Sequence, residues 1–420
     1  MQASTRPPTL ADTGPGPTFG AALQPVSVQI AQIGTPGRAS NLSMITRQKL
    51  VTFAIPTTAV ATLGLVFLLS PRTHTEEGDM PPRIADPSQT GRQIDVVFAV
   101  DTTGSMGGLI DGAKRTVWSI ANHIRQTDPN ANLRIGLVAY RDVGDDYITR
   151  DFALTTDLDA VFAELSSYQA DGGGDTPENV DAALDITLHK MKWRGDAKKL
   201  VFLVGDAPPA SRGDVPTFDV LAREAGERQI VINTIRAGHD PETAMSFQRI
   251  ASLGHGEFSS IQQDGGVQQI ATPYDQKMAE LSATIDSTSV IAGDDGIRAR
   301  YAAKMGAMAA APAAAKADRA SYYAKGTGAR SSEDLVGGYA SGAVNVDSVK
   351  DGELPSDLRG LAKPALKAEL DKRVAERKAA QAEIGELAKQ RDAYLKNQVT
   401  EAPPAGFDVK VKEAVEKQLK

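Results

Sequence analysis

Hydrophobic and polar positions follow two different periods over the middle of the chain. Short, almost wholly apolar runs at residues 94–100 and 200–204 predict strands that are buried on both faces. Residues 106–126 carry apolar side chains three and four positions apart, which is typical of a helix that buries one face. Because strands and helices of these kinds alternate over residues 92–290, this part predicts an α/β domain with a doubly wound, mainly parallel, Rossmann-like sheet.

The same two patterns place the remaining elements of this domain. Asp157 precedes one predicted helix in the position of an N-terminal cap, and Gly195 follows another as a stop. A helix between two strands lets the second strand run in the direction of the first, so most of the pairing is expected to be parallel. Strands are expected at residues 133–140, 148–154, 230–236 and 257–261, and helices at 158–168, 177–193, 218–229, 241–253 and 267–285.

The amino-acid composition and the predicted elements change after this domain. A connecting region at 291–355 is rich in Ala and Gly, and its first half predicts helix broken at Pro312. Residues 356–400 predict a long charged helix, which is either a weak coiled coil or a helix packed on its neighbours. A linker and a short helix are expected at 401–420. We expect this α-helical region to be a second interaction surface or an arm for homo-oligomerisation.

An apolar stretch without charged residues precedes the domain at residues 50–70. It is long enough to cross the hydrocarbon core of a bilayer, and the basic residues before it favour an N-terminus on the cytoplasmic side. Because no small-residue cleavage motif follows, an uncleaved signal anchor is expected, with a cleaved signal peptide or a buried core helix as alternatives. The prediction is a single-pass protein of the cytoplasmic membrane, with its folded domain periplasmic or extracellular.

The segments around the apolar stretch are predicted to lack regular structure. Residues 1–49 are expected to be disordered, and residues 71–91 form a polar, Pro-rich linker. Met44 begins a compact basic segment of the kind that precedes a signal sequence, so translation is expected to start at either Met1 or Met44. An Ala-rich chain without Cys and with one N-terminal anchor is typical of a bacterial protein.

Charge and cysteine content exclude several functions. The net charge of the 420-residue chain is −7, which gives nucleic-acid binding no electrostatic support. The chain contains no Cys, so it has no disulfides, thiolate metal sites or thiol nucleophiles. It also contains no phosphate-binding loop, dinucleotide fingerprint or Gly-x-Ser-x-Gly motif. We therefore expect that the protein is not an enzyme.

Oxygen-bearing side chains follow two of the predicted strands directly. Asp101, Thr103 and Ser105 come at the end of the first strand. Asp206 ends the later apolar strand, and Thr176 follows a run of three Gly in the loop before a helix. Ligand sites of open α/β sheets lie outside the carboxyl ends of the strands. We expect these five side chains to meet there and to hold a hard divalent cation through oxygen ligands.

The motif Asp-x-Thr-x-Ser at residues 101–105, with the distant Thr176 and Asp206, resembles the metal-ion-dependent adhesion site of the von Willebrand factor A (vWA) family. The family pattern has Ser where this chain has Thr103, whose hydroxyl is also able to ligate a metal. The resemblance covers residues 91–290, about half of the chain.

The resemblance implies a module that binds proteins. Two carboxylates and three neutral hydroxyls leave a bound cation under-neutralised, and the resemblance implies that an Asp or Glu carboxylate of a partner protein completes the coordination. Mg²⁺ suits a small site with few carboxylates, and Mn²⁺ accepts the same ligands. The expected function is therefore Mg²⁺-dependent adhesion or scaffolding on the outer side of the cytoplasmic membrane.

Two functions from other classes stay open. One is an intracellular vWA subunit that partners an ATPase in a metal-insertion or remodelling complex, although the apolar stretch at 50–70 argues against it. The other is a Mg²⁺-dependent enzyme, for which the motifs offer no general base or nucleophile. Asp142 and Asp145 lie in the turn after the strand at 133–140. They form either a self-satisfied turn or a secondary rim that tunes the metal field or contacts the partner.

Overall fold

The computed structural model describes residues 91–174, 176–212, 215–325, 330–398 and 406–420. The chain separates into two compact units, Met1–Thr75 and Glu76–Lys420, and all of the described residues belong to the second. The apolar stretch predicted to be a signal anchor, at 50–70, lies outside the described residues. No helix of the described ranges is both long and apolar enough to span a bilayer.

A mixed sheet forms the centre of the second unit. Over the described residues it has six strands in the order β3-β2-β1-β4-β5-β6. Strand β3 is antiparallel to β2 and all other neighbours are parallel, so the predicted mainly parallel α/β sheet is confirmed. The strands are β1 (Gln93–Asp101), β2 (Asn132–Tyr140), β3 (Thr149–Thr155), β4 (Lys198–Gly205), β5 (Ile230–Ala237) and β6 (His255–Ile261).

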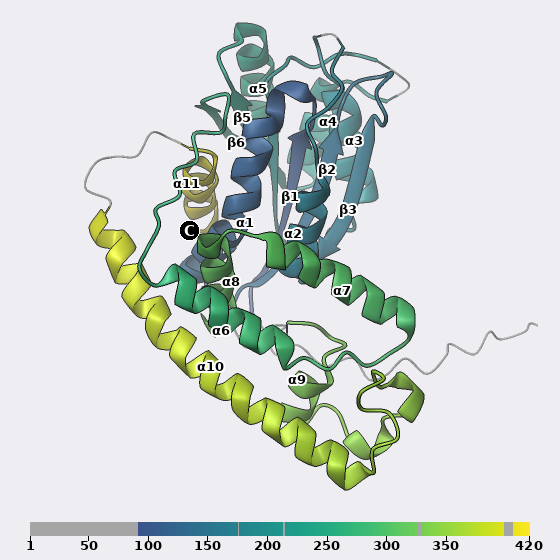
Figure 1. Ribbon diagram of the computed structural model, residues 1–420. Coiled ribbons are helices and arrows are strands. Elements are labelled where there is room, and N and C mark those ends of the chain that lie inside the picture. Colours follow the sequence, from purple (N-terminus) through teal and green to yellow (C-terminus); the bar gives the residue numbers. More distant parts are fainter. Residues whose placement is uncertain (1–90, 175, 213–214, 326–329, 399–405) are drawn as a thin grey trace, which may run out of the picture. The chain divides into compact units, whose positions relative to one another are not determined.

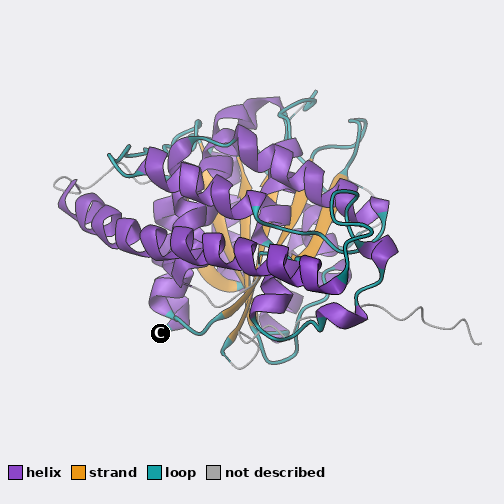
Figure 2. Ribbon diagram, turned by 60° about the horizontal axis from the view of Figure 1, so that its bottom comes forward, coloured by secondary structure: helices purple, strands orange, loops and turns teal. Residues whose placement is uncertain are grey.

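Helices cover both faces of the sheet (Figures 1 and 2). Successive side chains of a strand point to opposite faces, and in β1 Val96 and Phe98 belong to one core while Val97 and Ala99 belong to the other. The first core is closed by α1 (Gly107–Thr127), α2 (Leu158–Ser167) and α11 (Phe407–Leu419). The second is closed by α3 (Val180–Asp185), α4 (Phe218–Glu227) and α5 (Pro241–Leu253).

Helix α11, near the C-terminus of the chain, packs against one face of the sheet. Its first residue, Phe407, is buried with its ring centroid 6.1 Å from that of Phe98 in β1. The Phe407 N–H donates to the carbonyl of Gly265 (2.9 Å), in the loop after β6. At the other end of α11, the Leu419 carbonyl accepts a hydrogen bond from Arg92, next to the start of β1. The short helix predicted at the C-terminus thus belongs to a face of the sheet.

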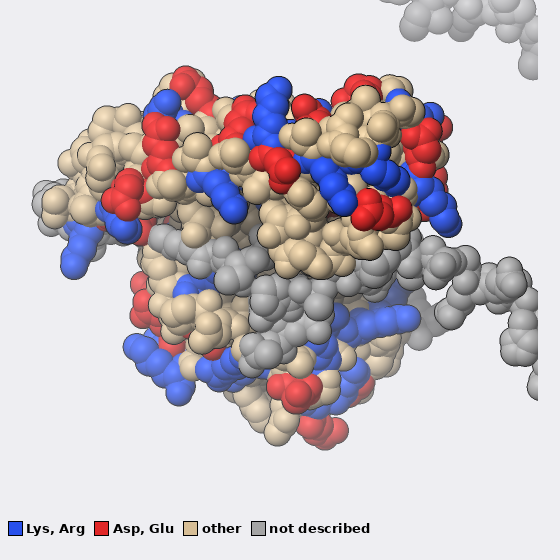
Figure 3. Space-filling view, turned by 90° about the horizontal axis from the view of Figure 1, so that it is seen from below, with Lys and Arg blue, Asp and Glu red and all other residues tan. Residues whose placement is uncertain are grey.

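The remaining helices form a second layer in which α10 packs on α6, α8 and α9 (Figure 1). Ala380, Ile384 and Ala388 of α10 are buried in a cluster with apolar residues of α6 and α8. The outer side of α10 carries charges of both signs, and Figure 3 shows Lys, Arg, Asp and Glu interspersed over this side of the molecule. These helices are α6 (Asp275–Ser287), α7 (Asp295–Ala310), α8 (Ala313–Lys325), α9 (Leu335–Ala340) and α10 (Lys363–Gln398), with short 3₁₀ turns at Val346–Ser348 and Asp351–Glu353.

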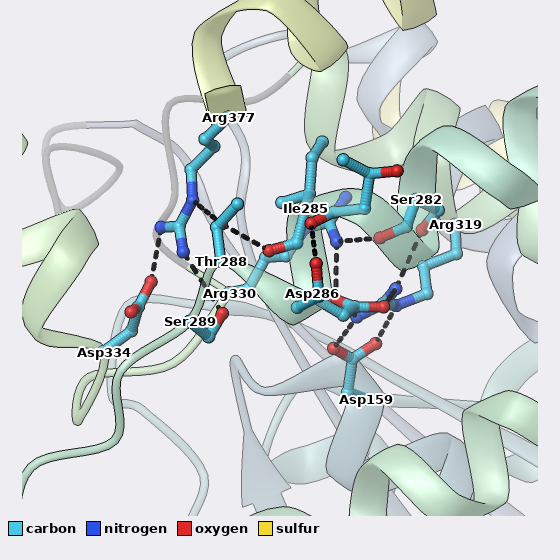
Figure 4. Close-up of polar contacts among 12 residues, drawn as sticks. Asp159, Ser282, Ile285, Asp286, Thr288, Ser289, Arg319, Arg330, Asp334 and Arg377 are labelled. Atoms are coloured by element: carbon cyan, nitrogen blue, oxygen red, sulfur yellow. Dashed lines mark hydrogen bonds and ion pairs between the residues drawn. The ribbon is translucent and has the colours of Figure 1, made fainter. Parts of the chain in front are cut away.

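Buried ion pairs connect this layer internally and to the domain that precedes it (Figure 4). Arg377 of α10 contacts Asp334, and its guanidinium also donates to Thr288 and Ser289. Arg391 of α10 donates to Asp275 (2.7 Å) and to Asp318. Arg377 and Arg391 are therefore partners of carboxylates in the same unit.

Candidate functional site

The two predicted carboxylates lie at the same edge of the sheet. Asp101 ends β1, and Asp206 directly follows β4, which pairs in parallel with β1 up to Val100 and Val204. Asp101 is completely buried, whereas Asp206 is partly exposed. Burial, together with the nearby charge of Asp206, raises the pKa of Asp101 to about 7, although the hydrogen bonds from Thr103 act to lower it. The two carboxylates are thus close enough to interact at the end of neighbouring strands.

Two hydroxyls extend from Asp101 toward the surface. Thr103 donates to Asp101 Oδ1 from its N–H (2.8 Å) and from its hydroxyl (2.7 Å). The Thr103 hydroxyl lies 3.4 Å from the hydroxyl of Ser105, which is exposed. These residues lead through a 3₁₀ turn (Gly104–Met106) into α1, so the positive end of that helix dipole faces the same place. The site therefore runs from a buried carboxylate to an exposed hydroxyl.

The second oxygen of Asp101 shows that these residues fit a cation. Asp101 Oδ2 is buried and has no hydrogen-bond partner among the described residues. A buried carboxylate oxygen without a partner is unfavourable, and a hard divalent cation is a suitable partner for it. Gly205 keeps this position open, because a Cβ there would lie 2.4 Å from the Tyr140 hydroxyl and 3.4 Å from Asp101 Oδ2.

The candidate site is built mainly from hydroxyl oxygens. The predicted set contains only two carboxylates, Asp101 and Asp206, and its other members are hydroxyls. Over the described ranges, no three or more His, Cys, Asp or Glu side chains are grouped so as to hold a metal ion. The candidate site therefore differs in composition from a metal site made of several carboxylates or imidazoles.

Thr176 lies on the loop that packs against Thr103. The Gly172 carbonyl accepts the N–H of Gly104 (3.3 Å), and a Cβ on Gly173 would lie 2.9 Å from Thr103 Cβ. The side chain of Thr176 is exposed and, within the described part of the chain, forms no hydrogen bond with the other four predicted ligands. The structure thus gathers Asp101, Thr103, Ser105 and Asp206, and places Thr176 on the adjacent loop.

Asp142 and Asp145 form an ion pair and hydrogen bonds with residues outside the predicted metal-ligand set. Asp142 is buried and forms an ion pair with Arg212. The carboxylate of Asp145 accepts the N–H of Gly173 at 3.1 and 3.2 Å, and that of Asp142 at 3.2 Å. Gly172 has a φ of +75°, and a Cβ there would lie 2.3 Å from Asp145 Oδ1, so the loop needs glycine at this point. The turn therefore positions the loop that carries Thr176.

Two further residues contact the site and have no signal in the sequence motif. Gln263 donates from Nε2 to Asp206 Oδ2 (2.6 Å) and to the Ser105 carbonyl (3.3 Å). The buried Tyr140 hydroxyl donates to the Val204 carbonyl (3.1 Å), beside the position of Gly205. Gln263 lies in a polar run after β6, where the sequence shows no pattern that distinguishes it from its neighbours. Tyr140 does have a signal in the sequence, since it ends the predicted strand that lies next to β1.

Comparison with known proteins assigns the domain that carries this site. Residues 95–273 match the family model of the von Willebrand factor A domain. This part of the chain is a vWA domain. Its limits include all five predicted ligands and the carboxyl ends of both strands that lead to the carboxylates. A vWA domain indicates a module for protein–protein interaction.

Relatives of the vWA domain occur in larger proteins of several organisms. The von Willebrand factor A domain-containing protein 7 of Rattus norvegicus is 29% identical over 192 residues, which are 45% of this chain and 20% of that protein. The alpha-protein kinase vwkA of Dictyostelium discoideum is 29% identical over 118 residues, or 27% of this chain and 18% of that protein. The chain thus spans a fifth or less of the length of these relatives.

Among solved structures, the BatB protein of Bacteroides thetaiotaomicron is similar to 40% of this chain and 90% of its own. The sequence identity is 15% and the TM-score is 0.33. The assignment of the vWA domain depends on the family match and on the sequence relatives.

Proposed function

We propose that this protein is a metal-dependent interaction module that binds an acidic residue of a partner protein through Mg²⁺. Asp101, Thr103, Ser105, Thr176 and Asp206 would hold the ion. Mn²⁺ is expected to replace it because it accepts the same oxygen ligands. The observation that carries the proposal is the buried oxygen of Asp101, Oδ2, which lacks a hydrogen-bond partner within the described residues beside two hydroxyls and a second carboxylate.

The charges of these residues support a carboxylate ligand. Asp101 and Asp206 supply at most two negative charges, and the hydroxyls of Thr103, Ser105 and Thr176 supply none. A bound divalent cation would offer an open coordination position that attracts an anionic oxygen from outside. The exposed Ser105 and Thr176 lie on the side from which such a group can approach.

The arrangement of the strands supports presentation of this face. Asp101 lies at the opposite end of the nine-residue β1 from Gln93, where the chain begins the sheet. The C-terminal Leu419 contacts Arg92 at that same far end. The proposed binding face thus lies at the opposite end of the sheet from Arg92 and Leu419. We propose that the protein displays this face on the outer side of the cytoplasmic membrane, and that it is not an enzyme.

The first experiment measures metal binding by the purified full chain. Titration calorimetry with Mg²⁺ and with Mn²⁺ would compare the wild type, Asp101→Asn and Asp206→Ala. Asp347→Asn serves as the matched control, because it removes an exposed carboxylate of the C-terminal helical layer. Binding that is lost in the two site variants and kept in the control supports the site, whereas equal binding in all four proteins contradicts it.

The second experiment asks whether a partner depends on the metal. The immobilised full chain would be exposed to a membrane and periplasmic extract in Mg²⁺, in chelator, and as the Asp206→Ala variant in Mg²⁺. A protein retained only by the wild type with Mg²⁺ supports adhesion through the metal. If the same proteins are retained in all three conditions, the metal-dependent interaction is wrong.

A further inference from the structure

A polar pocket lies beside the proposed metal site, between α1 and the loop that follows β6. Its volume is about 290 Å³, which leaves room for a partner's side chain and is small for a large ligand. Gly108, at the start of α1, lets the loop approach closely, because a Cβ there would lie 2.9 Å from Asp264 Cα. The pocket is lined by Gly108, Asp111, Arg115, Gln262, Asp264, Gly266, Val267 and Gln268.

Gln263 separates the pocket from the metal site. Its two neighbours, Gln262 and Asp264, line the pocket, while its own amide contacts Asp206 and the Ser105 carbonyl. Gly108 follows Ser105 by three residues in the first turn of α1. A partner segment that reaches the metal site is therefore next to the pocket.

The charged group of this pocket that lacks an ion-pair partner within the described residues is the guanidinium of Arg115. Its Nε is buried without a hydrogen-bond acceptor, and the guanidinium forms no ion pair in the part of the chain that the structure describes. The two carboxylates of the lining have partners, since Asp111 lies 3.6 Å from Lys114 and Asp264 accepts the N–H of Gly266 (3.0 Å). An acceptor oxygen from a ligand would pair with the accessible part of the Arg115 guanidinium, which has no carboxylate partner among the described residues.

The same two carboxylates restrict the chemistry of that ligand. A second carboxylate would be repelled by Asp111 and Asp264, and an ammonium group would be repelled by Arg115 and would offer it no acceptor. A carboxamide carries an acceptor oxygen for Arg115 and N–H donors for Asp111 and Asp264, without a net charge. We propose that the pocket binds the Asn or Gln side chain of a partner whose acidic residue occupies the metal site. This inference rests on the proposed function and adds a sequence requirement to it.

The geometry of α1 limits the spacing of the two partner residues. A helix rises about 1.5 Å per residue, so the middle of the pocket, near Asp111, lies roughly 9 Å along α1 from Ser105. An extended peptide covers about 3.3 Å per residue. The carboxamide is therefore expected about two to four positions from the acidic residue.

Synthetic peptides test this requirement directly. Each peptide has a Gly background, blocked ends and one Asp, with Gln, Ala, Glu or Lys placed two, three or four positions away. Their affinity for the full chain in saturating MgCl₂ would be measured by fluorescence polarisation, with Arg115→Met and Lys114→Met as test and control variants. The Met side chain keeps the apolar stem of each residue and removes only its charged head.

The expected result is binding about tenfold tighter for a Gln peptide than for the Ala, Glu and Lys peptides, because hydrogen bonds to a charged group contribute about that much. Arg115→Met should lose this preference and Lys114→Met should keep it. If binding depends on Mg²⁺ but shows no preference for Gln, or prefers Glu or Lys, the pocket assignment is wrong and the proposed function stands.

A failure of the proposed function would give a different binding result. A preference for Gln that depends on Arg115 but not on Mg²⁺, on Asp206 or on the Asp of the peptide would support the pocket and contradict the metal site. Absence of binding by every peptide at millimolar concentration would contradict both.

Discussion

Arg319 of α8 donates from Nε and Nη2 to the two carboxylate oxygens of Asp159 in α2, at 2.7 Å each. The two residues are 160 positions apart in the chain, and their side chains are 2% and 0% exposed. The same guanidinium donates to both oxygens of Asp286 in α6, at 2.7 and 2.9 Å (Figure 4). One side chain therefore joins the helical layer to the vWA domain.

Arg319→Met is expected to destabilise the protein by about 3–5 kcal/mol, because Asp159 would remain as a buried charge without its partner. Urea unfolding of the full chain at neutral pH would measure the loss. Arg249→Met is the control, since Arg249 forms an exposed ion pair with Asp219 and its removal should change the free energy of unfolding only slightly. Equal losses in the two variants would show that Arg319 is not a structural link.

Phe407→Ala tests whether α11 is part of the vWA core. The ring is buried and packs near Phe98, so its removal should lower the free energy of unfolding by about 3–5 kcal/mol. Val220→Ala removes a side chain of α4 that is 50% exposed and should change the same quantity by about 0.5 kcal/mol or less. A small effect of Phe407→Ala would mean that the sheet face is stable without this helix.

Asp181 in α3 should make stability depend on pH. Burial raises its pKa from 3.8 to about 6, although the Phe218 N–H donates to its carboxylate (2.7 Å). Between these values the folded state keeps a proton that the unfolded state has lost, so stability falls as pH rises from 4 to 6. In Asp181→Asn this fall should be absent, and the variant should gain at most about 3 kcal/mol relative to wild type between pH 4 and 7.

Asp219 is the control for this prediction, because its contribution to stability changes with pH in the opposite direction. The hydrogen bond from Arg249 lowers the pKa of Asp219, so its contribution to stability is present above its ordinary pKa and is lost as the pH falls. Asp219→Asn should therefore lose stability relative to wild type as the pH rises. Thermal unfolding from pH 2.5 to 7 would measure both variants, and parallel curves for Asp181→Asn and wild type would contradict the prediction.

Gln263→Ala is expected to weaken Mg²⁺ binding roughly tenfold, because groups that orient a metal ligand typically contribute that much to metal affinity. The Gln263 amide donates to Asp206 Oδ2 at 2.6 Å and thereby fixes the orientation of this carboxylate. Gln262→Ala, at the neighbouring position in the same loop, should leave the affinity nearly unchanged. Calorimetry with Mg²⁺ measures both, and equal affinities would remove Gln263 from the site.

Local patterns predicted most elements because their causes lie within a few residues. Helix α5 was expected at 241–253 and spans Pro241–Leu253, where Asp240 accepts the N–H of Thr243 (2.7 Å) and Pro241 occupies the first turn. The helix expected at 267–285 begins only at Asp275. The preceding residues form the loop that contacts α1 and Phe407. A local sequence pattern does not predict contacts between residues so far apart in the chain.

The sequence by itself determined the sheet, its parallel core and the position of Asp101, Thr103, Ser105 and Asp206 at one edge of it. Apolar runs define buried strands, and polar side chains placed at the ends of parallel strands must share one edge. Only the tertiary structure decided that Gln263 contacts Asp206, that Arg115 opens into a pocket, and that α11 closes a face of the sheet. It also made Arg377 and Arg391 internal ion-pair partners of Asp334 and Asp275. In each case the partner lies dozens of residues away, and such pairs form only when the folded chain brings them together.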